Sequence, residues 1–374
     1  MGLINDIFRT YGPEYLDRYG ESMPVEHKKV IDAICQCRTE TNGSIIYQCE
    51  QCSQFHSVPR SCGNRHCPGC QHHKARQWLE RQMERQLPGP HFMLTFTVPD
   101  QLRPFIRSHQ RLAYAALFET SADAIKTLAK DPTYLSGDTP GFFGVLHTWG
   151  RQLQYHPHIH YLVPGGALSS QDGQWHPSSP GFFLPVKALS KIFRAKFQDQ
   201  IEQAGLLGKV PPEVWTVDWN VNCQAVGTAE ATLNYLAPYI FKVAISESRI
   251  IKVEGDQVFF RYKKPHSERW RIMALPVMEF MRRFLQHVLP TGFMKVRYYG
   301  FLSPSSSVPL EEVKTRIELA YGFTITTPEI ETEPLPPMCC PYCGGTLVYW
   351  QSIVPLRHRR AIFKPSLALP APSG

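Results

Sequence analysis

Two short motifs in this sequence carry side chains suited to metal binding and to nucleophilic attack. The first is His-Pro-His-Ile-His at residues 156–160, within an apolar, strand-like run. Residues i and i+2 of a strand point to the same face, so we expect His158 and His160 to project together while Ile159 turns into the core. Two imidazoles fixed on one face of a strand form half of a site for a divalent metal ion.

A third metal ligand is needed, and His147 is the first choice. Its segment, residues 144–149, reads as a strand that we expect to pair with the strand of His158 through a short loop. The alternatives, all close to that loop, are Gln152, Gln154 and His156. Imidazole with oxygen ligands suits Mg²⁺ or Mn²⁺ and also accepts Zn²⁺ or Ni²⁺. Such an ion would polarise and orient a scissile phosphate.

The second motif is Tyr-Leu-Ala-Pro-Tyr at residues 235–239, in a stretch, 228–244, that reads as a helix. Residues i and i+4 of a helix share a face, so Tyr235 and Tyr239 can offer two phenol nucleophiles to one metal-bound phosphate. Lys242 follows and is placed to stabilise a phenolate or to contact phosphate. Pro238 disfavours helix at the preceding residue, so we expect a kink between the tyrosines.

Seven of the eleven cysteines lie between Cys35 and Cys70, and this crowding favours metal binding over disulfides. The pairs Cys49-x2-Cys52 and Cys67-x2-Cys70, separated by 14 residues, have zinc-ribbon spacing, so we expect one structural Zn²⁺ on these four thiols. A second zinc site would use the remaining donors of this stretch, namely Cys37, Cys62, His56 and His66, with Cys35 as a spare.

A further pair, Cys340-x2-Cys343, is followed by Gly344-Gly345 and is typical of half of another zinc ribbon. No matching pair follows it in the sequence. The nearest additional donors are Cys339 and His358, so the sequence leaves this half-site open.

Basic residues outnumber acidic ones, 40 to 32, which gives a formal net charge of +8. They cluster near 60–85 and 261–271, where they can neutralise phosphates. We expect the first cluster to surround the zinc module and bind DNA through Arg60, Arg65, Lys74 and Arg76. No apolar run reaches roughly 18 residues and the N-terminus lacks a signal-peptide pattern, so the expected location is the cytoplasm, or the nucleoid when DNA is bound.

The hydrophobic pattern is a mixture of helix and strand. We expect helices within 1–30 and at 72–86, 103–129, 186–204, 228–244 and 276–288. We expect strands at 91–98, 144–149, 158–163, 214–219, 250–253, 258–262 and 294–299. Breaks rich in Pro, Gly and Ser predict a helical and zinc-binding module (1–88), a catalytic domain (89–248), an α/β extension (249–330) and a tail with the Cys-x2-Cys knuckle (331–374).

The motifs, taken in order, resemble those of the two-tyrosine HUH transposases of rolling-circle insertion sequences (the insertion-sequence-ninety-one group). The resemblance covers most of the chain. It rests on residues 62–71 (CGNRHCPGCQ), 147–150 (HTWG), 158–160 (HIH) with 163–166 (VPGG), and 235–249, which ends in Ala-Ile-Ser-Glu-Ser-Arg.

The resemblance implies an α+β fold, in which an HUH nuclease domain with a central antiparallel sheet flanked by helices follows a zinc-binding module. It also implies a divalent metal held by His158 and His160, and nicking of one DNA strand with formation of a 5′-phosphotyrosine at Tyr235 or Tyr239. Pro238 departs from the expected pattern, and we favour Tyr235 as the first nucleophile. Arg249, in the matching C-terminal segment, would contact DNA.

The expected function is therefore rolling-circle transposition, with single-stranded DNA, the hairpin ends of the mobile element and target DNA as partners. A replication initiator with the same chemistry is the enzymatic alternative. A zinc-finger regulator without catalysis is the alternative from another class, but it leaves the histidine and tyrosine pairs unexplained.

Overall fold

A computed structural model describes residues 2–227, 233–234, 244–264, 267, 269–322 and 337–354. The chain divides into two compact units. The large unit comprises Met1–Cys35 and Gly63–Glu333, and the small unit comprises Gln36–Cys62 and Pro334–Gly374. In the small unit the last strand pairs with a strand of the N-terminal cysteine-rich stretch. The boundaries at 88, 248 and 330 stay predictions.

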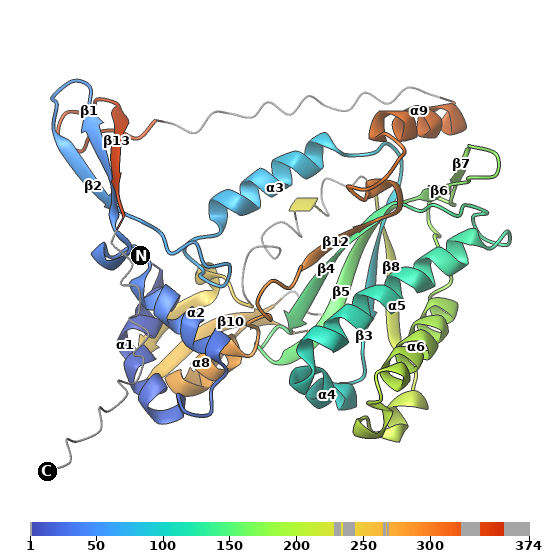
Figure 1. Ribbon diagram of the computed structural model, residues 1–374, viewed down its shortest axis with the longest axis horizontal. Coiled ribbons are helices and arrows are strands. Elements are labelled where there is room, and N and C mark those ends of the chain that lie inside the picture. Colours follow the sequence, from blue (N-terminus) through green and yellow to red (C-terminus); the bar gives the residue numbers. More distant parts are fainter. Residues whose placement is uncertain are drawn as a thin grey trace, which may run out of the picture. The chain divides into compact units, whose positions relative to one another are not determined.

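A five-stranded sheet forms the centre of the large unit (Figure 1), in the order β12-β4-β5-β3-β8. All four neighbouring pairs are antiparallel. The strands are β3 (His91–Thr97), β4 (Phe142–Trp149), β5 (Tyr155–Pro164), β8 (Asn220–Gly227) and β12 (Val296–Tyr299). Strands β4 and β5 are rich in aromatic and β-branched residues, which suit a pleated surface buried on both faces.

One face of this sheet is covered by two long helices, α5 (Gln110–Lys130) and α6 (Val186–Gln203), which run along the same side of the strands in Figure 1. The main core lies here. Phe96 of β3 packs edge-on against Phe193 of α6, with ring centroids 5.2 Å apart. Ile159 and Tyr161 of β5 point into the same core and are fully buried.

The close packing of β4 against β5 depends on a glycine. Gly144 pairs with Tyr161, and a Cβ at Gly144 would lie 2.3 Å from the Tyr161 ring. The missing side chain lets the ring lie across β4, and its hydroxyl reaches Ser121 of α5 at 2.7 Å. This buried hydrogen bond fixes α5 against the sheet.

Helix α3 (His72–Glu84) packs against the opposite face of the sheet. There the buried residues are Trp78 of α3, Phe143 and Val145 of β4, Leu162 of β5, and Leu233. The side chains of His147, His158 and His160 lie on this second face. Each is separated by an even number of residues from Phe143, Val145 or Leu162 of the same strand, and such residues share a face.

The rest of the large unit contains a second sheet, a hairpin and further helices. Helices α1 (Leu3–Tyr19), α2 (Val25–Gln36) and α8 (Val277–Leu285) accompany a second antiparallel sheet of β9 (Ile250–Glu254), β10 (Gln257–Lys263) and β11 (Trp270–Pro276). A β6–β7 hairpin (Gly166–Leu168 and Trp175–Pro177) packs against α9 (Leu310–Tyr321). A short helix, α4 (Arg103–Ser108), precedes α5.

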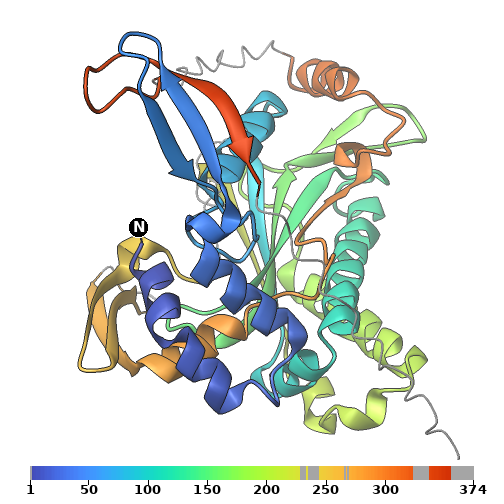
Figure 2. The ribbon, with the colours of Figure 1, turned by 60° about the vertical axis from the view of Figure 1, so that its left-hand side comes forward.

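The small unit is a three-stranded antiparallel sheet in the order β13-β1-β2. It joins β1 (Ser44–Cys49) and β2 (Phe55–Pro59) to β13 (Leu347–Ile353) from near the other end of the chain. Figure 2 shows β13 in red beside the two blue strands. The pairing runs from Ser44 opposite Ile353 to Cys49 opposite Leu347.

The predicted α+β class is correct, including the central antiparallel sheet flanked by helices. Most predicted elements also lie where expected, among them β3, β4, β5, α6, the β9–β10 hairpin and α8. The predicted helix at 228–244 lies almost entirely outside the described residues, as do Tyr235, Tyr239 and Lys242.

Two predictions about elements are wrong. The segment 214–219 is not a strand; a 3-10 turn occupies Pro212–Trp215, and Trp219 Nε1 donates to the Val214 carbonyl at 3.0 Å. The predicted helix at 103–129 is broken at His109, whose backbone (φ −123°, ψ 42°) separates α4 from α5. In both places local backbone geometry and aromatic packing override the apolar pattern.

The helices of the described part of the chain include none that is both long and apolar enough to cross a membrane.

The main core gives a direct stability prediction. Phe193→Ala should lower the free energy of unfolding by about 3–5 kcal/mol, because the fully buried ring touches both Phe96 and Trp219 and leaves a cavity. Phe182→Ala, at a half-exposed ring, should change it by less than about 0.5 kcal/mol. Urea denaturation followed by circular dichroism measures both; equal losses would contradict the assigned core.

Candidate functional site: three histidines on the sheet and a four-thiol cluster

Three histidines meet on the second face of the central sheet. His147 of β4 lies directly opposite His158 of β5, and His160 lies two residues further along β5, opposite Val145. Their candidate ligand atoms all lie within 4.8 Å of one another. The strand pairing therefore brings together two segments that the sequence had only suggested to be neighbours.

Hydrogen bonds at Nδ1 orient two of the rings. His158 Nδ1–H donates to the His156 carbonyl at 2.7 Å, which leaves Nε2 of His158 as the unprotonated nitrogen. His160 Nδ1 is bonded to Thr95 Oγ1 of β3 at 2.9 Å. Because outer hydrogen bonds of this kind fix a metal-binding imidazole, both rings are held ready to present Nε2.

The pKa values of the three histidines favour the neutral form that a metal requires. Burial lowers the pKa of His158 to about 3. Burial and the neighbouring imidazoles also lower the pKa values of His147 and His160 well below the usual value. At neutral pH the three rings are therefore uncharged and suited to bind a divalent cation without first losing a proton.

His156 belongs to the same motif but has a different partner. Arg103 Nη2 donates to His156 Nδ1 at 2.6 Å, and burial together with this arginine lowers the pKa of His156 to about 4. Gln154, another alternative ligand, has its side-chain oxygen bonded to the backbone N–H of Gln152. Of the residues predicted as the third metal ligand, His147 is the one that the structure groups with His158 and His160.

Sequence reasoning missed Trp149 and Lys295 beside the three histidines. The Trp149 ring stacks on His147, with centroids 4.9 Å apart and planes at 18°. Lys295 Nζ lies 4.6 Å from the Trp149 ring centroid, and burial, with the charge of Arg65, lowers the pKa of Lys295 to about 7. Lys295 is close only because the segment before β12 bonds to β4, through Leu146 N–H and the Lys295 carbonyl at 3.0 Å.

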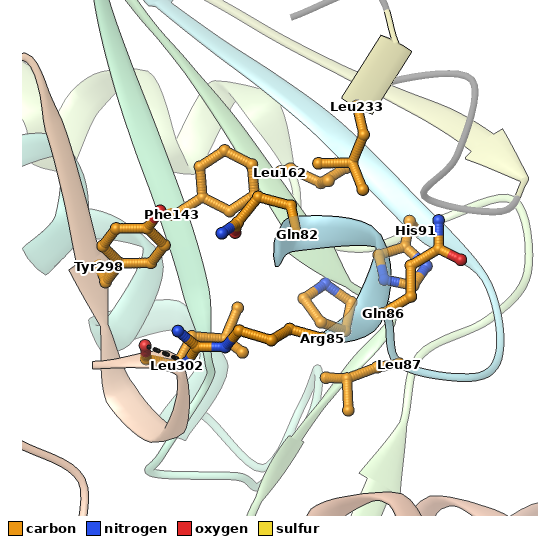
Figure 3. Close-up of a pocket in the computed structure, with 11 residues that line it drawn as sticks. Gln82, Arg85, Gln86, Leu87, His91, Phe143, Leu162, Leu233, Tyr298 and Leu302 are labelled. Carbon is orange, nitrogen blue, oxygen red and sulfur yellow. Dashed lines mark hydrogen bonds between the residues drawn. The ribbon is translucent and has the colours of Figure 1, made fainter. Parts of the chain in front are cut away.

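The two predicted nucleophiles and Lys242 lie outside the described residues, but the residue two positions before Tyr235 is described. Leu233 is buried against the second face of the sheet, in one cluster with Phe143, Leu162 and Trp78. Figure 3 shows Leu233 beside Leu162 and Phe143 at the edge of a cavity of about 30 Å³. Leu233 thus lies on the face of the sheet that carries the histidines.

A second set of donors lies within the small unit. Cys49, Cys52, Cys340 and Cys343 form one group, with sulfur atoms 3.4 Å apart for Cys49 and Cys343 and 3.7 Å apart for Cys52 and Cys340. Tetrahedral zinc with Zn–S bonds of about 2.3 Å separates its sulfurs by roughly 3.8 Å. The four thiols therefore fit a structural zinc site.

The two turns that carry these thiols are alike. Ser53 N–H bonds to the Cys49 carbonyl and Gly344 N–H to the Cys340 carbonyl, each at 2.9 Å, so each Cys-x2-Cys pair folds into a tight turn. The backbone N–H of Cys52 donates to the Cys49 sulfur and lowers the pKa of that thiol to about 7, whereas the contact with Cys49 raises the pKa of Cys343. A lowered pKa favours the thiolate that zinc binds.

This arrangement corrects the predicted pairing of the cysteines. Cys49 and Cys52 do not share a site with Cys67 and Cys70; their partners are Cys340 and Cys343, the pair that the sequence left open. Spacing misled the prediction because the true partners are 288 and 294 residues away. His56, offered for a second site, instead lies 3.2 Å from Cys340 Sγ.

His66 also differs from its predicted role. Its Nε2 accepts the backbone N–H of Leu289 at 3.1 Å, and burial lowers its pKa to about 3, so this nitrogen is engaged within the core. Cys67 and Cys70 belong to the large unit, where Asn5 Nδ2 donates to Cys67 Sγ at 3.6 Å. A second zinc ion on Cys37, Cys62, Cys67 and Cys70 stays a prediction of the sequence.

The predicted DNA-binding cations have different surroundings. Lys74 and Arg76 are exposed on α3, where Arg76 bonds to Glu80 at 2.8 Å. Arg65 is partly buried and donates to the carbonyls of Phe293 and Pro290 at 2.6 and 2.7 Å, so it holds that loop. The other two predicted DNA-binding residues are Arg249 and Arg60.

Arg249 donates to the carbonyls of Arg261 and Arg151, at 2.8 and 2.6 Å. It therefore ties β10 to the loop after β4. Arg60, in the small unit, is partly exposed at the end of β2, where its backbone bonds to Gly43 and Arg38.

The four-thiol group predicts that a substitution near the C-terminal end of the described residues, far in sequence from Cys49 and Cys52, causes loss of zinc. Cys340→Ser should remove about one equivalent of zinc per chain and lower the unfolding temperature, because three thiolates bind zinc more weakly than four. Cys339→Ser, at the exposed neighbouring thiol outside the group, should keep the full zinc content. Elemental analysis of the purified proteins measures both, and zinc retained in Cys340→Ser would contradict the site.

Comparison with known proteins agrees with this geometry. Residues 141–308 match a family model described as "Putative transposase", and residues 7–98 match one described as "Transposase zinc-binding domain". "Putative transposase y4qJ" of Sinorhizobium fredii is 37% identical over 319 residues, covering 80% of each chain. "Transposase for insertion sequence element IS801" of Pseudomonas savastanoi pv. phaseolicola is 28% identical over 354 residues, covering 87% of this chain and 83% of the relative. No solved structure matches the chain. Together the family models and these relatives show that the chain belongs to the insertion-sequence-ninety-one family of transposases.

Proposed function

We propose that this transposase cuts and rejoins single-stranded DNA by a metal-dependent, rolling-circle reaction with 5′-phosphotyrosine intermediates. The observation that carries the proposal is the meeting of three neutral imidazoles on the sheet face against which Leu233 packs. A donor group for a cation and Leu233, two residues before Tyr235 in the sequence, thus share one surface. A DNA-binding regulator would need neither feature.

The proposed metal ligands are His147, His158 and His160, with Mg²⁺ or Mn²⁺ as the ion. Three nitrogen donors leave the remaining positions of a hexacoordinate ion open for phosphate oxygen and water. The ion would act as a Lewis acid that draws charge from the scissile phosphate and orients it. Thr95 and the His156 carbonyl position the imidazoles through the Nδ1 bonds described above.

The nucleophile in the first step is the phenolic oxygen of Tyr235, which follows Leu233 by two residues. This oxygen forms a bond to phosphorus, the bond between phosphorus and the 3′ oxygen breaks, and the proton lost by the phenol ends on that 3′ oxygen. The DNA 5′ phosphate stays on the enzyme as an ester, so the bond energy is kept for rejoining. Tyr239 supplies the second nucleophile for the other strand end.

The DNA partners are the single-stranded and hairpin ends of the mobile element and the target strand. Lys74 and Arg76 project from α3, the helix that covers the histidine-bearing face, so they lie on the side from which DNA would approach. Arg65 and Arg249 act by fixing loops through carbonyl contacts, rather than as freely mobile cations.

The proposed chemistry predicts a covalent protein–DNA adduct. Full-length protein incubated with a labelled oligonucleotide of the element end and Mn²⁺ should form an adduct that survives denaturing electrophoresis. The adduct should disappear in the Tyr235→Phe, Tyr239→Phe double variant and persist in Tyr134→Phe, at an exposed tyrosine between α5 and β4. Tyr235→Phe alone should abolish the first cleavage. Absence of any adduct with the wild-type protein on both element ends would refute the proposal.

The imidazole group predicts the metal affinity of variants. His160→Ala should abolish measurable Mn²⁺ binding at the site, because it removes one of three donors. Thr95→Val, which removes the hydrogen bond to His160, should weaken binding by about 10–100-fold. His176→Ala, at a histidine paired with Asp172 in the β6–β7 hairpin region, serves as the control. Isothermal titration or Mn²⁺ electron paramagnetic resonance measures the Mn²⁺ affinity of each variant. If His176→Ala lost as much Mn²⁺ affinity as His160→Ala, the assignment of the metal ligands would be wrong.

A further inference from the structure

A cavity of about 330 Å³ lies within the large unit, and one of its lining residues, Trp149, stacks on His147. It is formed by α3, the end of β4 and the segment that leads into β12. Its size falls in the range of pockets that hold small organic groups. Among the described residues that line it, none belongs to the group of His147, His158 and His160.

Four aromatic side chains contribute to the cavity wall. They are Trp78, Trp149, Phe293 and Tyr298. Two of these rings are fixed by a hydrogen bond, since Trp78 Nε1 donates to Tyr298 Oη at 3.0 Å. Trp78 is further held by an edge-on contact with Phe143, with centroids 5.6 Å apart. Rigid aromatic faces are the surfaces on which unpaired bases stack.

Three basic side chains, Arg65, Lys74 and Lys295, line the cavity, and Lys295 lies over the Trp149 ring. None of the described residues that line the cavity is acidic. Aromatic rings combined with ammonium groups suit a nucleotide, which offers a flat base and a negative phosphate, better than they suit a purely apolar ligand.

Trp149 connects the cavity to the metal-binding group. Its ring lines the cavity and also stacks on His147 at 4.9 Å. A base held in the cavity and a phosphate held at the three histidines would thus both lie beside Trp149.

We propose that this cavity holds an unpaired nucleobase next to the scissile phosphate, stacked on the aromatic wall and held by Lys295. The cavity would then select the nucleotide at the cleavage point and pull it out of any base pair. The inference rests on the proposed function, since it needs a phosphate at the histidines.

The test measures how binding depends on a single base. The probe is a single-stranded oligonucleotide spanning the cleavage position mapped from the adduct, with an abasic analogue placed at each nearby nucleotide in turn. Binding is measured with the full chain carrying Tyr235→Phe and Tyr239→Phe, in the presence of Mn²⁺. At one nucleotide adjoining the scissile phosphate, removal of the base should weaken binding by about 5- to 150-fold.

Two variants report on the cavity. Lys295→Met removes the ammonium group, and Val296→Phe adds volume at a lining position while keeping the lysine. In both variants, removal of that base should weaken binding by less than about threefold, because the base is no longer held in the cavity. Lys126→Met is the matched control: its Nζ lies 5.4 Å from the Tyr299 ring centroid, and Lys126 is not among the residues lining the cavity.

The outcomes separate this inference from the proposed function. If adducts form but no abasic position is penalised, or if the penalty is unchanged in both Lys295→Met and Val296→Phe, the cavity proposal is wrong and the proposed chemistry stands. If no adduct forms with the tyrosines intact, the proposed function fails first. Mn²⁺ affinity equal to wild type in the two variants shows that the histidine group is unchanged.

Discussion

The register between β4 and β5 is the constraint on which the rest of the site depends. It places His147 opposite His158 and, through Gly144, lets the Tyr161 ring cross β4. Side chains alternate with a period of two, so a slip of one residue would turn all of β5's inward side chains outward and its histidines into the core. The same register sets the histidines on the side of Leu162, where Leu233 packs. Core packing on one face and ligand geometry on the other are therefore two results of one pairing.

The sequence was sufficient for the parts of the site that depend on local geometry. Strand geometry alone predicts that His158 and His160, two residues apart, share a face. His147 could be chosen because its strand directly precedes theirs in the sequence. Trp149 and Lys295 could not be found in this way. Lys295 reaches Trp149 from a segment roughly 146 residues later, and only the pairing of β12 at the sheet edge brings it there.

Elements were predictable where the apolar pattern is strong and less so elsewhere. Buried strands such as β4 carry nearly continuous apolar residues. Strand β8, in contrast, is at the sheet edge and mostly exposed, so the sequence Asn-Val-Asn-Cys-Gln-Ala-Val-Gly gave little signal. The segment with Trp215 and Trp219 has strand-like composition, but its rings stack on each other at 6.0 Å beside α6 and hold a turn. Cysteine spacing failed for another reason: ligand pairs combine in space, and spacing within one stretch cannot reveal a partner pair at the far end of the chain.

The small unit has a consequence for how the protein is made. Its first two strands and Cys49 emerge early during translation, whereas β13 and Cys340 are among the last described residues. Translation adds about 5–20 residues per second, so an interval of 288 residues leaves the first pair of thiols without its partner pair for roughly 15–60 s. A nascent or truncated chain cannot close this sheet. A chain that stops before Cys340 therefore lacks both the third strand of this sheet and half of its four-thiol group.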